Sequence, residues 1–186
     1  MVKGIFPPSL IGPRQFRAAW SGNIAKVRLW LSMLVDQDDI NATSAYDYTA
    51  FVLACEAGHE SMVRLLVDAG GDINTTKEIQ NANGCERNLF ATALYAACQN
   101  NHMAIVRLLL DAGVDVEGVS DLNATPLHRA CLYLHETDEG CEKIKLEMVQ
   151  LLIEKGANIE AKAVREGRDC LRWWRYLVLL LFGNVS

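Results

Sequence analysis

Several features that would assign this chain to a class at once are absent from its sequence. The six cysteines form no Cys-x-x-Cys motif, and this argues against a structural zinc site. The longest apolar run, Leu177–Phe182, is far shorter than the roughly 20 residues that cross a bilayer. Residues 1–12 hold one lysine, two prolines and no sustained apolar run, unlike a secretory signal. We therefore expect a protein with no membrane span, in the cytoplasm or the nucleus.

Basic charge and catalytic motifs are also lacking. Against 18 Lys and Arg the chain has 23 Asp and Glu, a net charge of -5. Nucleic-acid binding needs a basic face, so we expect no nucleic-acid partner. The sequence contains no Gly-rich phosphate loop, no metal-ligand cluster and no nucleophile motif. We predict that the chain is not an enzyme and has no catalytic, cofactor or metal site.

What the sequence does contain is a short motif that recurs. Thr125–Ala130 reads Thr-Pro-Leu-His-Arg-Ala, and weaker copies occupy Thr49–Ala54 and Thr92–Ala97. In these two copies Val63 and Val106 follow the first threonine by 14 residues, and Asp-Ala-Gly comes soon after. A period of about 33 residues with this internal order resembles the ankyrin repeat.

The resemblance implies an all-α solenoid, in which stacked helix pairs bury one continuous core. Residues 1–12 are expected to be an N-terminal leader, and residues 164–186 a degenerate fifth repeat or a capping tail. Between them, residues 13–163 are expected to be the ankyrin-repeat domain. It is divided into about four repeats: 13–45, 46–78, 89–121 and 122–163.

Three segments depart from the repeat pattern. About ten extra residues separate Asn74 from Thr92, where the family has a β-hairpin finger, so a longer finger or a loop is expected. That insertion is either a tolerated surface loop or a contact with a partner. Residues 134–143 form an acidic insertion before a helix that we expect to be one turn longer than usual. The apolar tail, residues 173–182, is a capping helix, a tail fixed by a partner or a membrane surface, or the end of a truncated product.

Recurring polar and small residues are predicted to be structural. The cysteines that follow the motif's last alanine, Cys55, Cys98 and Cys131, form one column. Stacked helices lie about 8–10 Å apart, whereas a disulfide needs Cα atoms within about 7 Å, so these thiols should be buried and reduced. His59 is expected to hydrogen-bond a neighbouring loop, and the resemblance implies a structural role for His128. Asn101 replaces a glycine and should adopt a left-handed conformation.

The same resemblance implies a binding surface on the concave face and the finger tips. In the family, contacts usually come from finger tips and from first-helix positions beside the motif's last alanine. The finger candidates are Tyr46, Tyr48, Leu122 and Asn123. The helix candidates are Trp20, Glu56, Gln99, Leu132 and Tyr133. Aromatic residues among them suit an interface, because Trp and Tyr are enriched among interface hot spots.

These observations favour a monomeric adaptor, scaffold or inhibitor that binds another protein, whose identity the sequence does not give. The alternative is a substrate-recruiting subunit of a larger assembly such as a ubiquitin ligase, with the C-terminal tail as the docking element. A thiol enzyme that uses Cys141 or Cys85 with His135 is a third hypothesis. Glu139 and Glu142 disfavour it, because neighbouring carboxylates raise the pKa of a cysteine.

Overall fold

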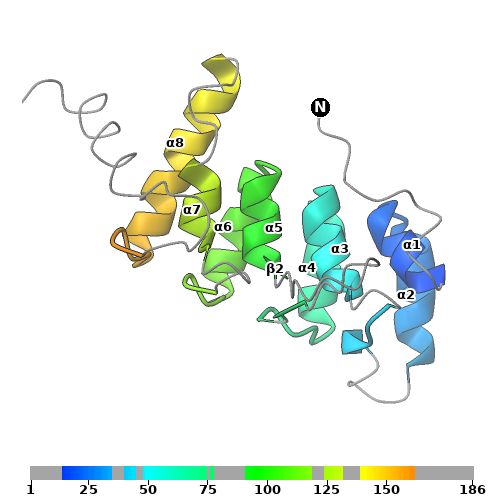
Figure 1. Ribbon diagram of the computed structural model, residues 1–186. Coiled ribbons are helices and arrows are strands. Elements are labelled where there is room, and N and C mark those ends of the chain that lie inside the picture. The colour runs from blue at the N-terminus through cyan, green and yellow to red at the C-terminus, as the bar shows by residue number, and fades with distance from the viewer. Residues whose placement is uncertain are drawn as a thin grey trace, which may run out of the picture.

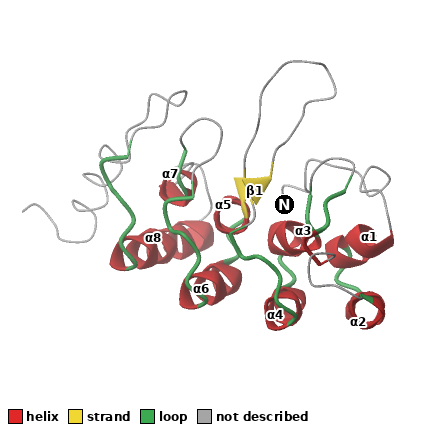
Figure 2. Ribbon diagram, turned by 90° about the horizontal axis from the view of Figure 1, so that it is seen from below, coloured by secondary structure: helices red, strands yellow, loops and turns green. Residues whose placement is uncertain are grey.

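The computed structural model describes residues 14–34, 40–44, 48–74, 76–77, 91–118, 124–131 and 139–161. Within these residues, eight helices form two rows that run side by side (Figures 1 and 2). The first row holds the first helix of each pair: α1 Arg14–Trp20, α3 Ala50–Ala57, α5 Ala93–Gln99 and α7 Pro126–Cys131. The second row holds α2 Ile24–Met33, α4 Glu60–Asp68, α6 Met103–Asp111 and α8 Glu139–Glu154. This arrangement confirms the predicted all-α solenoid of stacked helix pairs.

The recurring threonine begins each first helix after α1. The Thr49 and Thr92 hydroxyl oxygens each accept the backbone N–H three residues ahead, at 3.2 Å. The Thr125 hydroxyl accepts the His128 N–H in the same way, at 3.3 Å. A helix leaves its first four N–H groups without intrahelical partners, and a threonine N-cap satisfies one of them. The motif's first residue is therefore a helix start signal.

Left-handed residues follow the first helices α1, α3 and α5, where the chain turns back. Gly22 and Gly58 have φ angles of 69° and 82°, and Asn101 stands at the same repeat position with φ 60°. Glycine adopts this conformation without strain, and asparagine is among the few other residues that tolerate it. The prediction for Asn101 is confirmed.

The core lies between the two rows of helices. Its largest fully buried side chains come from both rows: Phe16, Leu53, Met62, Leu66, Leu94, Ile105, Leu109, Leu127, Met148 and Leu152. Within the first row, Ala54, Ala97 and Ala130 are completely buried at equivalent positions. Small residues at these points let neighbouring first helices pack closely. The column of Cys55, Cys98 and Cys131 is buried and unbridged, as predicted.

Two paired strands lie at the base of the segment where a longer finger or a loop was predicted. Strand β1, Thr76–Lys77, pairs antiparallel with β2, Ala91–Thr92, in the register Thr76↔Thr92 and Lys77↔Ala91. Residues 78–90 lie outside the described residues. A bridge between Thr43 and Thr49 marks an equivalent finger base before α3.

The second helix of the fourth pair is longer than expected. Helix α8 has 16 residues, whereas α4 and α6 have nine each. The difference of seven residues is close to two turns at about 3.6 residues per turn, not the single turn predicted. The N-terminal part of α8 contains the second half of the acidic insertion. In Figure 1 the helix extends past its neighbours. The leader 1–12, residues 132–138 and the tail 164–186 lie outside the described residues.

Candidate protein-binding surface

Three of the predicted contact residues occupy one register along the first row of helices. Trp20, Glu56 and Gln99 each stand two residues before a left-handed residue, Gly22, Gly58 or Asn101. Gln99 is exposed, and Trp20 and Glu56 are partly buried. Neighbouring helices in such a stack lie about 8–10 Å apart, so the three side chains are spaced along the row. The structure therefore places three chemically different groups, an indole, a carboxylate and an amide, at equivalent points of successive helices.

Two residues that the sequence analysis missed join this surface. The guanidinium carbon of Arg129, on α7, lies 5.2 Å from the centroid of the Tyr95 ring on α5. Its Nε–H donates to the Gln99 side-chain oxygen at 3.4 Å. We call Trp20, Glu56, Tyr95, Gln99 and Arg129 the first-helix face. The sequence contained one signal for the missed residues. Arg129 is charged, whereas the other copies of the motif have Leu53 and Ala96 at the same position.

Tyr48 does not lie at an exposed finger tip, and that prediction is corrected. The residue is only 8% exposed. Its backbone N–H donates to the Ser44 hydroxyl at 3.1 Å, and its carbonyl accepts the Ser44 N–H at 2.9 Å. These bonds close the finger base and place the tyrosine against the core. Burial raises the pKa of the Tyr48 hydroxyl, and the Glu56 carboxylate raises it further. The ring therefore supports α3 and is not available as an anchor at a tip.

The other predicted contact residues lie outside the described residues. They are Tyr46, Leu122, Asn123, Leu132 and Tyr133.

Histidines join consecutive repeats behind this face. The Nε2–H of His59 donates to the Trp20 carbonyl at 2.8 Å, and that of His102 donates to the Glu56 carbonyl at 3.1 Å. Each imidazole also packs on a left-handed glycine: a Cβ added at Gly58 would lie 2.5 Å from the His102 ring. His59 has the neighbouring-repeat contact that was predicted for it. For His128, the described bonds join Nδ1 to the N–H and hydroxyl of Thr125, within its own motif.

A ladder of side chain to backbone hydrogen bonds joins the loops that follow the second helices. Asn41 Oδ1 accepts the Asp72 N–H at 2.8 Å, and Asn74 Oδ1 accepts the Asp115 N–H at 2.9 Å. Glu117 Oε1 accepts the Asn158 N–H at 2.7 Å. Each acceptor stands at the same position of its repeat. The histidines and this ladder together fix the spacing of the helices that carry the first-helix face.

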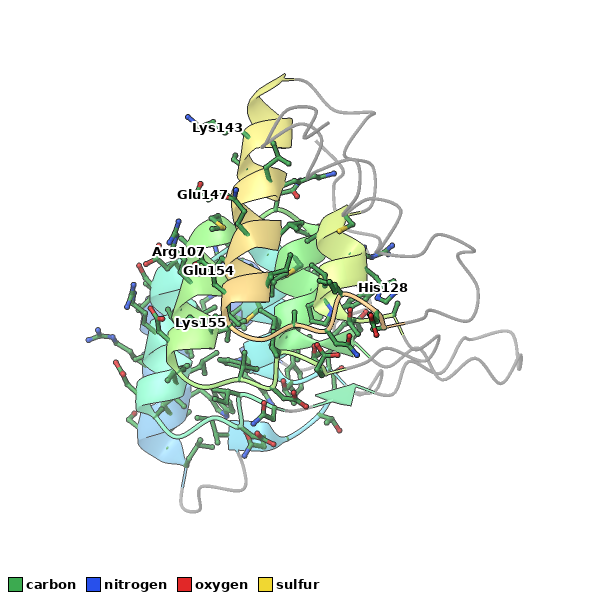
Figure 3. All side chains as sticks on the ribbon, turned by 90° about the vertical axis from the view of Figure 1, so that its left-hand side faces the viewer. Arg107, His128, Lys143, Glu147, Glu154 and Lys155 are labelled. Atoms are coloured by element: carbon green, nitrogen blue, oxygen red, sulfur yellow. The ribbon has the colours of Figure 1, made fainter. Side chains whose placement is uncertain are left out.

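The second row of helices carries ion pairs on its outer surface. Arg107 on α6 bonds Glu147 on α8, as Figure 3 shows, and Lys155 bonds Asp111 at 3.0 Å. All four side chains are at least 40% exposed. Exposed pairs of this kind contribute about 0.2–1 kcal/mol each. They connect α8 and the residue that follows it to α6.

Two of the buried thiols have a low reactivity. Burial raises the pKa of the Cys55 and Cys98 thiols well above its ordinary value, which makes them poor nucleophiles. No group of three His, Cys, Asp or Glu residues among the described residues could hold a metal ion. Cys85, Cys141 and His135, the members of the thiol-enzyme hypothesis, have no described side chains.

The repeat frame seen in the structure matches a known family. A profile for ankyrin repeats in three copies matches residues 71–163, half of the chain, and a single ankyrin-repeat profile matches residues 46–78. The chain belongs to the ankyrin-repeat family. Ankyrin repeats generally mediate protein–protein interaction, and proteins built from them are typically non-enzymatic.

A search of curated proteins found no match to this sequence. The helix pair α1–α2 precedes both matched ankyrin-repeat segments, yet α1 packs against α3 as α3 packs against α5. Among the described residues, no helix is both long and apolar enough to cross a membrane.

Proposed function

We propose that this ankyrin-repeat chain is a non-enzymatic interaction module that binds a protein partner on its first-helix face. The observation that carries the proposal is a contrast between positions. The residues that join repeats are alike from one repeat to the next, as in the pairs Gly22–His59 and Gly58–His102. The residues on the face differ at equivalent points. A surface with a fixed spacing and variable chemistry suits recognition of one particular partner.

The composition of the first-helix face supports the same role. It contains a tryptophan, a tyrosine and an arginine, the three residue types most enriched among interface hot spots. Arg129 is held between Tyr95 and Gln99, so part of the entropy of ordering its side chain is lost before a partner arrives. The second row instead carries exposed ion pairs. Ion pairs of this kind are common on protein surfaces and do not by themselves indicate a binding site.

Site-specific photo-cross-linking tests the proposal. Gln99 on α5 and Gln150 on α8 are both exposed glutamines, one on each row of helices. A benzophenone amino acid is placed at either position of the full chain, and the protein is irradiated in extract of the cells that express it. We expect covalent products with another protein from position 99 and none above background from position 150. Equal labelling from both positions, or none from position 99, contradicts the proposal.

The alternative of a substrate-recruiting subunit depends on residues 164–186, which lie outside the described residues. No observation of the structure favours it over the general interaction role.

A further inference from the structure

The first helix pair carries charges of one sign only. Residues 14–34 contain Arg14, Arg17, Lys26 and Arg28 but no acidic residue, whereas the whole chain has a net charge of -5. All four side chains are exposed, and none of them forms an ion pair within the part of the chain that the structure describes. Because α1 and α2 stand at one end of the rows of helices in Figure 1, that end is basic in an acidic protein.

Three of these basic residues occupy positions that the next repeat buries. Counted from the left-handed glycine after each first helix, they correspond to residues that are at most 2% exposed: Arg14 to Ala50, Arg17 to Leu53 and Lys26 to Met62. The pair α3–α4 has the pair α1–α2 before it, whereas no described helix precedes α1. Side chains that are buried in the one pair and exposed in the other therefore lie on the side where a preceding pair stacks.

Two apolar side chains are exposed on the same side of α2. Leu29 and Met33 are 62% and 65% exposed, whereas the equivalent Leu65 and Ala69, in and just after α4, are partly buried. Lys26, Leu29 and Met33 are spaced three and four residues apart, so they form one stripe along the helix. We call the following residues the basic end face: Arg14, Arg17, Lys26, Leu29 and Met33.

The basic end face suits the packing of a helix. In the next repeat, the equivalent positions are covered by the preceding helix pair, as α3 is by α1. Terminal repeats usually present a polar outer face, so Leu29 and Met33 are unusual here and can be buried by an apolar stripe. Acidic residues beside that stripe would form charge-assisted pairs with Lys26 and the two arginines.

Other occupants fit this face less well. A second copy of the chain that docked through the same face would bring like charges together, which disfavours binding. An anionic membrane attracts the same cations, but a helix that lies in a membrane surface buries a long apolar face. Leu29 and Met33 are the two large apolar side chains that the described helices α1 and α2 expose.

We propose that the basic end face binds an acidic amphipathic helix of a partner protein, which takes the place of a preceding repeat. No residue of this surface belongs to the first-helix face. The inference therefore goes beyond the proposed function and can fail without it.

A selection from a helical peptide library tests the inference with a defined probe. Peptides of about 18 residues carry leucine at spacings of three and four, and random Asp, Glu, Lys, Arg, Gln or Ala elsewhere. They are displayed on phage and selected on the full chain, and we expect the enriched peptides to be acidic. A synthetic copy with two acidic residues beside the leucine stripe changed to lysine should bind the wild-type chain at least about tenfold more weakly, because attraction becomes repulsion.

Matched charge variants at the two ends of the solenoid locate the binding surface. Lys26→Glu reverses one exposed charge on α2, and Lys143→Glu makes the same change on α8, where Figure 3 labels the lysine. We expect the acidic peptide to bind Lys26→Glu about fivefold more weakly and Lys143→Glu as tightly as the wild type. The lysine-substituted peptide should regain affinity on Lys26→Glu, which a structural effect of the variant would not produce.

Matched apolar variants test the helix-packing part. Leu29→Ser combined with Met33→Ser removes the exposed apolar side chains of α2, and should weaken binding of the acidic peptide by about tenfold. Ile144→Ser, at an apolar residue of α8 that is 37% exposed, should leave the affinity unchanged. Because the substituted peptides are tested on the wild-type chain, the inference stays testable even if a variant fails to fold.

The outcomes that overturn the inference are distinct from failure of the proposed function. It is wrong if no peptide is enriched, if the enriched peptides are not acidic, or if their affinity falls with Gln99→Ala and not with Lys26→Glu. Vesicles of phosphatidylcholine with about 30% phosphatidylserine test the membrane instead. We expect the full chain not to sediment with them, and sedimentation that Lys26→Glu abolishes would also overturn the inference. The proposed function stands in each case, because cross-linking from position 99 probes a different surface.

Discussion

The repeat junctions and the first-helix face use the same helices in opposite ways. At the junctions, equivalent positions carry the same groups: a left-handed glycine against a histidine ring, and a side-chain oxygen against a loop N–H. On the face, Trp20, Glu56 and Gln99 occupy equivalent positions and share no chemistry. We propose that stability depends on residues that recur, whereas recognition depends on residues that do not. Each half of that statement can be tested without the other.

The largest effect on stability is expected at the glycine that packs on His102. Gly58 and Gly113 have the same φ angle, 82°, but a Cβ at Gly58 would lie 2.5 Å from the ring, whereas one at Gly113 would have no neighbour within 4 Å. Gly58→Ala should lower the free energy of unfolding by about 2–3 kcal/mol, from left-handed strain plus a disturbed hydrogen bond. Gly113→Ala should lower it by about 1–2 kcal/mol, from strain alone. Urea unfolding measures both, and equal losses would contradict the role of the histidine contact.

A smaller effect is expected in the loop ladder. Glu117 and Glu160 stand at the same position of consecutive repeats, but only the Glu117 carboxylate accepts a loop N–H from a described residue. Glu117→Ala should lower the free energy of unfolding by about 1 kcal/mol, the usual net value of one hydrogen bond. Glu160→Ala should change it by less than about 0.5 kcal/mol, as expected for an exposed site. If the two variants are equally destabilised, the ladder does not hold the loops together.

The ion pair between α6 and α8 should contribute still less. A double-mutant cycle with Arg107→Ala and Glu147→Ala is expected to give a coupling free energy of about 0.2–1 kcal/mol, because both groups are half exposed. The coupling should shrink in 1 M salt, where the screening length is only about 3 Å. A coupling that does not respond to salt would show that the two side chains do not interact as an ion pair.

The pH dependence of the free energy of unfolding should follow the titration of His102, which lies behind the first-helix face. Burial lowers the pKa of His102, its bond to the Glu56 carbonyl opposes that shift, and His59 lowers the pKa further. The unfolded chain therefore binds a proton first, so this contribution to stability is complete above about pH 6.5 and is lost as the pH falls through the lower pKa of the folded state. Unfolding free energies measured between pH 5 and 7 should fall on acidification more steeply for the wild type than for His102→Gln. A steeper fall for the variant would contradict the assigned direction.

The features that could be predicted from the sequence are those that recur at equivalent positions of successive repeats. The left-handed Asn101 and the buried cysteine column were both predicted from alignment of the repeats, because local geometry repeats when local sequence repeats.

What depends on contacts between repeats was harder to predict. Tyr48 was assigned to a finger tip because its position allowed it, but its side chain is buried in the core that the stacked repeats share. Tyr95 and Arg129 were missed because each belongs to a different copy of the motif, and only stacking brings them together. The length of α8 was underestimated because an acidic insertion gave no periodic signal for its first turns.

The measurement that tests the account most directly is affinity capture, without a cross-linker, of the partner identified by cross-linking, compared between two variants of the full chain. One combines Trp20→Ala with Gln99→Ala on the face, and the other combines Arg64→Ala with Gln150→Ala on the second row. Arg64 and Gln150 are exposed, so the second-row variant should unfold within about 0.5–1 kcal/mol of the wild type. Trp20 is partly buried against the core, so the face variant should be less stable than that but is expected to remain folded. We predict at least a tenfold loss of partner with the face variant and wild-type recovery with the other. Full recovery by a folded face variant would contradict the claim that the non-recurring residues of the first helices form the binding surface.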